Sequence, residues 1–331
     1  MVLLIILRSL VIVVTRKIGI VIKKIAVLGV FVLLIAVDCR AQQDPILTSY
    51  MYNSQVINPA YAGIWEKIGF TALVRKQWAG INRSPLTESF SFHSPLRNEA
   101  AGIGLNIMND KFGLENRLSI LGDYSYEVYL SRRTRLRMGI KFGFVNYKNP
   151  LTEYELYPDN KYDHAFDEDV DLKFLPNFGV GFFMYHEYFY AGLSIPKIVE
   201  NDLKENFHNY STSAEVRTVY LNGGVVLPVD PLNYIVFKPT LLIRATWGTP
   251  LQADIAANFM IRERLWLGAM FRTGAALCFT GNWIFSNNLR VGFAMDVTMN
   301  EIYPYQNGTF EFTIGYDIDF FGRSYLRARY F

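Results

Sequence analysis

Residues 310–320 read FEFTIGYDIDF, and this stretch decides the fold. Its even-numbered positions are large and apolar, whereas its odd-numbered positions are charged, small or polar. Successive side chains of a β-strand point to opposite faces, so the segment has one apolar face and one polar face. The same alternation recurs in residues 137–144 and 291–297. Long alternating strands of this kind, in a chain whose last residue is Phe331, indicate a transmembrane β-barrel.

Aromatic residues are abundant in this chain, which contains 25 Phe, 21 Tyr and 5 Trp among 331 residues. From residue 42 onward, no run of apolar residues is long enough for a membrane helix. An outer-membrane barrel carries apolar and aromatic side chains outside and small or polar side chains inside. The composition therefore favours membrane crossing by strands.

The first 41 residues form a separate segment. Two lysines precede an apolar run at residues 25–37, and the small residue Ala41 follows shortly after it. This order is typical of a secretory signal peptide, so we predict cleavage after Ala41. An earlier apolar run at residues 2–14 fits an upstream extension from a misassigned translation start. The alternative is that both runs are membrane helices kept in the mature protein, which their short length disfavours. Acylation of Cys39 is a further alternative, which the preceding Asp38 disfavours because a small residue is expected there.

Removal of the signal changes the charge balance. It carries six of the 33 Lys and Arg residues and one of the 30 Asp and Glu residues, which leaves 27 positive charges against 29 negative charges. The mature chain is therefore slightly acidic, and nothing in its charge suggests nucleic-acid binding. Cys278 becomes the only cysteine, so an intramolecular disulfide is excluded.

The alternation predicts an all-β protein with a single antiparallel transmembrane barrel of about 14 strands in residues 66–331. A segment at residues 42–65, here called the lead-in, precedes it. The predicted strands are residues 66–78, 86–94, 100–109, 116–130, 134–147, 175–186, 188–195, 216–229, 233–246, 251–262, 264–273, 276–286, 288–299 and 309–320.

Connection lengths alternate in step with these strands. From a periplasmic N-terminus, the even-numbered connections are short and the odd-numbered ones include the long stretches at residues 148–174 and 196–215. Outer-membrane barrels have short periplasmic turns and longer external loops, so both patterns predict the same topology. A soluble sandwich or propeller would have turns of similar length at both ends and would bury its Phe and Tyr residues. We expect residues 310–320 to close the barrel by pairing with the first strand.

Clusters that could carry chemistry have simpler explanations in this chain. The acidic residues between 163 and 171 could bind Ca²⁺ on an external loop, but a solvated acidic loop is favoured because the sharp-turn Gly and the distal Glu of such sites are missing. The four histidines are far apart in sequence, which disfavours a metal site. Ser89, Ser91 and His93 share one strand face, which a polar lumen lining explains better than a hydrolase site. We predict no catalytic, metal or cofactor site.

Charged residues on the inner face of the predicted strands are the last group of candidate functional residues. Their expected role is structural, since opposite charges can pair across the lumen; a selective pore is the alternative. The residues predicted to face the lumen are Lys67, Arg75, Gln77, Arg137, Lys141, Asp296, Glu311, Asp317 and Asp319.

The lead-in and the first hairpin carry a family resemblance. Residues 44–63 read DPILTSYMYNSQVINPAYAG, and RKQWAG follows at residues 75–80. Shorter matches are PNFGVG at 176–181, YAGLSIP at 190–196 and the final RYF. These motifs resemble the PorP/SprF family of type IX secretion membrane proteins over nearly the whole mature chain.

The resemblance implies a non-enzymatic outer-membrane component of a secretion apparatus associated with gliding motility. It implies a role in export or surface attachment of a large adhesin, with a periplasmic ring and a peptidoglycan-binding protein as further partners. It implies no cofactor and no catalytic residue. The lead-in is expected to plug the barrel, to dock a periplasmic partner, or only to close the barrel base. The lead-in residues singled out for this role are Tyr50, Asn53, Asn58, Pro59, Ala60, Tyr61 and Gly63.

A barrel similar to fatty-acid transporters, which take up hydrophobic small molecules, is the alternative. Such proteins also have 14 strands and an Asn-Pro-Ala motif near the N-terminus, here Asn58-Pro59-Ala60. The lead-in is short for the plug of that family.

Overall fold

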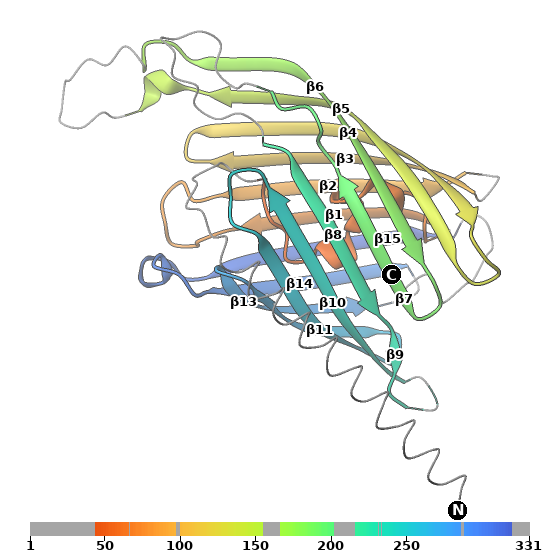
Figure 1. The fold of residues 1–331 in the computed structure, drawn as a ribbon. Coiled ribbons are helices and arrows are strands. Elements are labelled where there is room, and N and C mark those ends of the chain that lie inside the picture. Colours follow the sequence, from red (N-terminus) through yellow and green to blue (C-terminus); the bar gives the residue numbers. More distant parts are fainter. Residues whose placement is uncertain are drawn as a thin grey trace, which may run out of the picture. The chain divides into compact units, whose positions relative to one another are not determined.

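The computed structural model describes residues 44–65, 67–96, 100–154, 166–201, 216–230, 232, 234–285 and 288–319, and these form an all-β barrel (Figure 1). The compact unit that contains the barrel does not include residues Gly248–Leu251. The predicted signal peptide, the start of the acidic stretch at 163–165, and the chain end at 320–331 lie outside the described residues. No α-helix among the described residues is long and apolar enough to cross a membrane.

Fifteen strands are assigned in the described part of the chain. They are β1 (Ile68–Lys76), β2 (Leu86–Pro95), β3 (Ala101–Phe112), β4 (Glu115–Tyr129), β5 (Arg135–Asn149), β6 (Val170–Tyr185), β7 (Phe189–Ile195), β8 (Thr218–Val225), β9 (Leu227–Pro228), β10 (Ile235–Thr246), β11 (Gln252–Ile261), β12 (Leu265–Arg272), β13 (Ala276–Ile284), β14 (Leu289–Thr298) and β15 (Thr309–Ile318). Among the described residues, short 3₁₀ turns outside the lead-in include η4 (Leu151–Glu153) and η6 (Tyr303–Tyr305).

Neighbouring strands are antiparallel, and the sheet closes on itself. β10 pairs with β8, β9 and β11, and β1 pairs with both β2 and β15. β8 and β9 are two parts of one strand, interrupted at Val226, whose N–H donates to the carbonyl of Tyr188. The barrel therefore has 14 strands. The predicted fold is confirmed, including closure by the C-terminal strand, whose register runs from Ile68 opposite Ile318 to Lys76 opposite Phe310.

Alternation separates the two faces of the barrel wall. In β15, Phe312, Ile314 and Tyr316 are about half exposed, whereas Glu311 and Thr313 are buried. Large apolar side chains are exposed in the same way on every long strand. Because a closed barrel leaves no unpaired strand edge, this apolar outer surface suits lipid contact.

The two ends of the barrel differ in the lengths of their connections. One end carries the connections at residues 77–85, 150–169, 196–217 and 299–308, and the other carries turns such as 130–134, 186–188 and 262–264. In outer-membrane barrels the long connections face the cell surface. We call the first end the outer mouth and the second end the inner mouth.

Two strand boundaries were predicted wrongly. β6 begins at Val170 rather than at residue 175, because residues 170–175 pair with the end of β5 across a bulge between Val145 and Tyr147. The predicted strand 216–229 is divided by the interruption at Val226. In β6 the bulge leaves Lys173 and Phe174 both exposed and exchanges the two faces of the strand, but the even-numbered positions 170–182 are apolar on both sides of it, so the sequence pattern does not reveal it.

The lead-in lies inside the ring of strands (Figure 1). It contains three 3₁₀ turns, η1 (Tyr50–Tyr52), η2 (Ser54–Val56) and η3 (Pro59–Tyr61). Short turns satisfy part of its backbone internally, since the N–H groups of Asn53, Ile57 and Ala62 donate to carbonyls three residues earlier. Asn58 caps η3 by accepting a hydrogen bond from the Ala60 N–H, and Pro59 occupies the first position of the turn, where no N–H is needed.

Candidate functional site in the barrel interior

Glycines on the inner faces of the strands make room for the lead-in. A side chain at Gly102 would overlap the carbonyl of Ala62, and one at Gly104 would overlap the amide of Gln55. At Gly139 and Gly181 a side chain would collide with residues 58–60 of the lead-in. The lead-in backbone thus approaches the wall where only glycine leaves space for it.

An alternating chain of charges follows the inner face of the wall from β10 through β14 and β15 to β1, beneath the outer mouth, so these charges pair between nearby strands and not across the lumen. Its ion pairs are Arg244–Asp254 at 3.0 Å, Asp254–Arg272 at 3.1 Å, Arg272–Asp296 at 3.4 Å, Asp296–Arg75 at 2.9 Å and Arg75–Glu311. We call these six residues the ionic belt. Each of its charges is buried and lies beside opposite charges, which offsets the cost of removing it from water.

The lead-in is bound to the ionic belt through Thr48 and Ser49. The backbone N–H groups of both residues donate to the carboxylate of Glu311. The Thr48 hydroxyl donates to Asp296 at 2.7 Å and accepts from Arg75 at 3.1 Å. Charge-assisted bonds of this kind are stronger than neutral ones, so Thr48 is the most firmly held point of the lead-in.

A second anchor lies midway through the barrel. The Gln55 side-chain amide donates to Asp123 at 2.8 Å, and the backbone carbonyl of Gln55 accepts from the Lys141 ammonium at 3.2 Å. Lys141 also forms a buried ion pair with Asp123 at 3.0 Å. Asn53 donates to Ser91 at 2.9 Å, so the wall of β2 takes part as well.

The Asn-Pro-Ala-Tyr part of the lead-in contacts β6 to β8. The Asn58 side chain donates to the carbonyl of Phe182 at 3.0 Å. The Tyr61 hydroxyl accepts from Asn222 at 3.2 Å, and its ring lies 4.2 Å from the ring of Phe183. Ser194 donates to the carbonyl of Ile57 at 2.7 Å.

Arg137 binds the lead-in near the inner mouth. Its guanidinium donates to the carbonyl of Ala62 at 2.9 Å and pairs with Glu127 at 3.1 Å. The next residue, Gly63, has a φ of +73°, which glycine adopts readily, and it lies against the backbone of Gly102.

The lead-in ends at the inner mouth with an aromatic contact. Arg290 lies 4.4 Å from the ring of Trp65 and pairs with Asp317 at 2.9 Å. The Trp65 ring also contacts His93 edge-on at 5.2 Å. The lead-in thus runs from the outer mouth to the inner mouth through the lumen.

Asp44 holds the first described residues of the lead-in at the outer mouth. Its carboxylate pairs with Lys197 at 2.8 Å and with Arg117 at 3.5 Å. Burial opposes ionisation of this carboxyl group, but Lys197 and Arg117 together hold its pKa below the usual value of 3.8.

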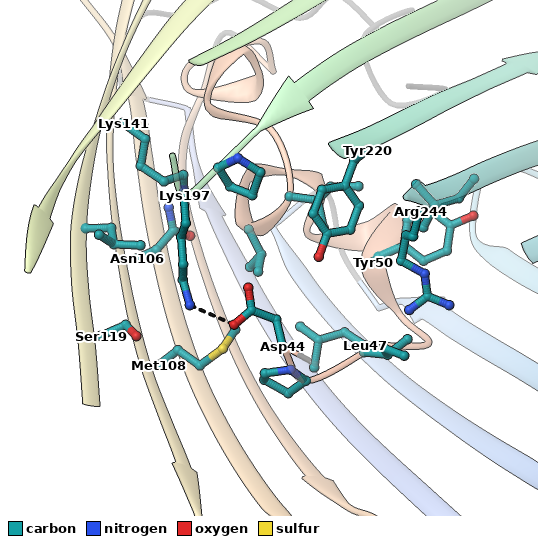
Figure 2. A pocket seen from close by; sticks show the side chains of 17 residues that line it. Asp44, Leu47, Tyr50, Asn106, Met108, Ser119, Lys141, Lys197, Tyr220 and Arg244 are labelled. Carbon is teal, nitrogen blue, oxygen red and sulfur yellow. Dashed lines mark hydrogen bonds and ion pairs between the residues drawn. The ribbon is translucent and has the colours of Figure 1, made fainter. Parts of the chain in front are cut away.

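Two cavities border the start of the lead-in. The larger, of about 460 Å³, opens at the outer mouth, and its lining includes Gln77, Trp78 and three members of the ionic belt, Arg75, Arg272 and Asp296. The smaller, of about 60 Å³, is mainly apolar and lies between the lead-in and the wall (Figure 2). Residues 44–46 line both cavities and so lie between them.

The predicted site residues have distinct places in this arrangement. The seven lead-in residues singled out by the resemblance are all buried in the interior. Arg75, Arg137, Lys141 and Asp317 point inward and form ion pairs, and Gln77 lines the outer cavity. Asp319 lies beyond the end of β15 and is exposed.

Several important residues were not singled out from the sequence. Asp123, Glu127, Asp254 and Arg272 lie at inward positions of alternating strands, so the same pattern could have found them. The roles of Thr48 and Ser49 leave no comparable signal in the sequence, because they depend on backbone groups in an irregular segment.

In the described part of the chain, the residues considered for a metal site or a hydrolase site are not arranged as such a site. No group of three or more His, Cys, Asp or Glu residues there could hold a metal ion. Asp169 accepts hydrogen bonds from Thr152, which lower the pKa of its carboxyl group. Ser91 is bonded to Asn53 and Asn106, so its hydroxyl belongs to the packing of the lead-in. His164 and His208 lie outside the described residues.

Solved structures similar to this chain are bacterial membrane barrels. Omp33 of Acinetobacter baumannii matches with a TM-score of 0.43 and 7% identity, over 76% of this chain and 99% of that chain. A TodX mutant, a monoaromatic hydrocarbon channel, matches with a TM-score of 0.43 and 8% identity, over 77% and 90%. BamA of Haemophilus ducreyi matches with a TM-score of 0.38 and 8% identity, over 76% and 70%. No curated protein matches the chain.

The sequence model of one family covers most of the chain. This family is described as the type IX secretion system membrane protein PorP/SprF, and its model matches residues 39–316. A closed barrel with an apolar outer face agrees with that description and with a location in the bacterial outer membrane. The chain therefore belongs to the PorP/SprF family of type IX secretion system membrane proteins.

Proposed function

We propose that this type IX secretion component acts without catalysis of its own, as a membrane scaffold that supports export or surface attachment of a large adhesin. The observation that carries the proposal is the packing of the lead-in from one mouth to the other, with the ionic belt beneath the outer mouth. A lumen occupied in this way suits a scaffold better than a conduit for a polypeptide. Its contribution is then to bind other components at its ends.

The two ends suit different partners. The short turns at the inner mouth face the periplasm, where a ring and a peptidoglycan-binding protein are the proposed partners. The outer mouth carries the longer connections and the 460 Å³ cavity, and there we propose contact with the secreted adhesin. Gliding motility would follow from the adhesin that is displayed.

The second candidate is uptake of a hydrophobic small molecule, as in fatty-acid transporters. The mainly apolar cavity next to Leu47 and Leu121 favours this role. However, its volume of about 60 Å³ is far below the several hundred Å³ that is typical of ligand pockets. Uptake would therefore require a large movement of the lead-in.

Deletion of the gene tests both candidates. We expect loss of surface adhesin, measured by antibody binding to intact cells, with uptake of a labelled hydrophobic compound unchanged. Complementation with the wild-type gene is the control and should restore adhesin display. Intact adhesin display with lost uptake would overturn the secretion role and support the transporter role. Loss of neither would overturn both.

A further inference from the structure

The first four described residues of the lead-in are held differently from the rest. Among the described residues, the polar contacts found for residues 44–47 are the two ion pairs of Asp44. The following residue, Thr48, is bound by its backbone and by its side chain to the ionic belt. The polar contacts that hold residues 44–47 in place are therefore those of the Asp44 carboxylate, whereas the next residue, Thr48, is firmly bound.

The partners of Asp44 come from two separate parts of the wall. Arg117 lies near the start of β4, and Lys197 lies two residues after the end of β7. Figure 2 shows the Lys197 ammonium directed at the Asp44 carboxylate, beside the apolar cavity. Asp44 thus links the lead-in to the connection that follows β7 at the outer mouth.

We propose that Asp44 is a latch, and that its release lets residues 44–47 swing into the outer mouth while Thr48 stays in place. Residues 44–46 lie between the two cavities, so the movement joins the apolar cavity to the cavity at the outer mouth. Four extended residues reach at most about 13 Å from Thr48, which limits how far this segment can move. Leu47, which is buried in the apolar cavity, then becomes exposed to the cell surface.

The strength of the latch suits a reversible movement. The side chains of the Asp44 ion pairs are 15–20% exposed, whereas that of Glu311, which binds the backbone of Thr48, is 1% exposed, so water weakens the bonds at Asp44 more than those at Thr48. Opening at Asp44 is therefore a local event that leaves the barrel and the deeper anchors intact. This device is independent of the proposed secretion role.

Cysteine labelling tests the latch in intact cells. Leu47→Cys is placed in the otherwise wild-type chain and in an Asp44→Asn chain, and a membrane-impermeant maleimide is added from outside. We expect labelling to be about tenfold faster in the Asp44→Asn background. Ser49→Cys, which lies beyond Thr48, should stay unlabelled in both backgrounds. Asp169→Asn is the matched control, since it removes a carboxylate at the same barrel end and should leave the rate at Leu47→Cys unchanged.

The outcomes separate the latch from its alternatives. Equal rates in the two backgrounds would overturn the proposal, as would labelling of Leu47→Cys only after the outer membrane is permeabilised. Labelling of Leu47→Cys and Ser49→Cys together would show release of the whole lead-in and would also overturn it. Folding is checked by the difference in gel mobility between boiled and unboiled protein. If Asp44→Asn fails this check, Lys197→Gln replaces it, with a smaller increase expected because Arg117 remains.

Discussion

At the scale of single residues, the interior depends on charges that satisfy one another. Arg75 lies between Asp296 and Glu311 and has only 3% of its surface exposed, so its removal would leave two carboxylates close together in the interior. Buried ion pairs contribute little net stability, but removal of one partner is costly. The alternation in sequence predicts that Arg75 and Glu311 face inward. It cannot show that they meet, because the pairing depends on register across strands far apart in sequence.

Replacing Arg75 with leucine should therefore destabilise the folded barrel. We expect a loss of about 3–5 kcal/mol, because an uncompensated buried charge remains. Urea unfolding followed by gel mobility measures it. Lys173→Leu is the control, since its pair with Asp171 is exposed and should contribute less than about 1 kcal/mol. An Arg75→Leu midpoint equal to that of the control would contradict a structural role of the belt.

Lys238 is buried without a counter-charge among the described residues. Its ammonium lies 5.0 Å from the ring centre of Tyr190 and 5.7 Å from that of Trp266. These rings offset only part of the cost of burying a charge. Lys238→Met should therefore raise the unfolding free energy by about 1 kcal/mol, measured by the same assay. A lower midpoint would indicate that Lys238 has a stabilising partner.

Asp44 should make stability depend on pH. Because its pKa is lower in the folded chain than its usual value of 3.8, its pairing stabilises the protein at higher pH. That contribution disappears as the pH falls through the lowered pKa. Lys197 and Arg117 favour the charged form, while Asp110 is a neighbouring like charge. The wild-type chain should be more stable than Asp44→Asn by about 1 kcal/mol near neutral pH and equal to it at strongly acidic pH. A pH-independent difference would refute this pairing.

At the scale of elements, the strands follow from local patterns and the lead-in does not. Period-two alternation and loop lengths are sufficient to predict 14 strands, because every strand must present one face to lipid and one to the interior. The lead-in has no such periodicity, so its sequence left a plug, a docking segment and a base closure all open. Its path depends on distant strand positions, notably the inner-face glycines 102, 104, 139 and 181.

Filling one of these glycine positions should displace the lead-in without unfolding the barrel. Gly139→Leu places a side chain where residues 59 and 60 lie. We expect chymotrypsin to cut at the lead-in tyrosines, while the barrel keeps its shift in gel mobility on boiling. Gly281→Ala is the control, since a side chain there meets only Leu267 at 3.8 Å. If the lead-in of Gly139→Leu stays protected from chymotrypsin, the space left by Gly139 is not required for packing of the lead-in.

At the scale of the whole molecule, the structure is a barrel whose core is its own N-terminal segment. Contacts from Asp44 at the outer mouth to Trp65 at the inner mouth involve most of the wall, so the lead-in and the strands stabilise one another. Without the lead-in, the barrel would enclose a wide, polar, water-filled space of the kind found in porins.

Ion conductance in planar lipid bilayers tests this account most directly. The purified wild-type barrel should show no stable open-channel current, because the lead-in fills the lumen. A variant that lacks residues 44–65, verified as folded by its gel mobility, should conduct steadily. A steady current through the wild-type protein, or no current through the folded deletion variant, would contradict a barrel closed by its own N-terminal segment.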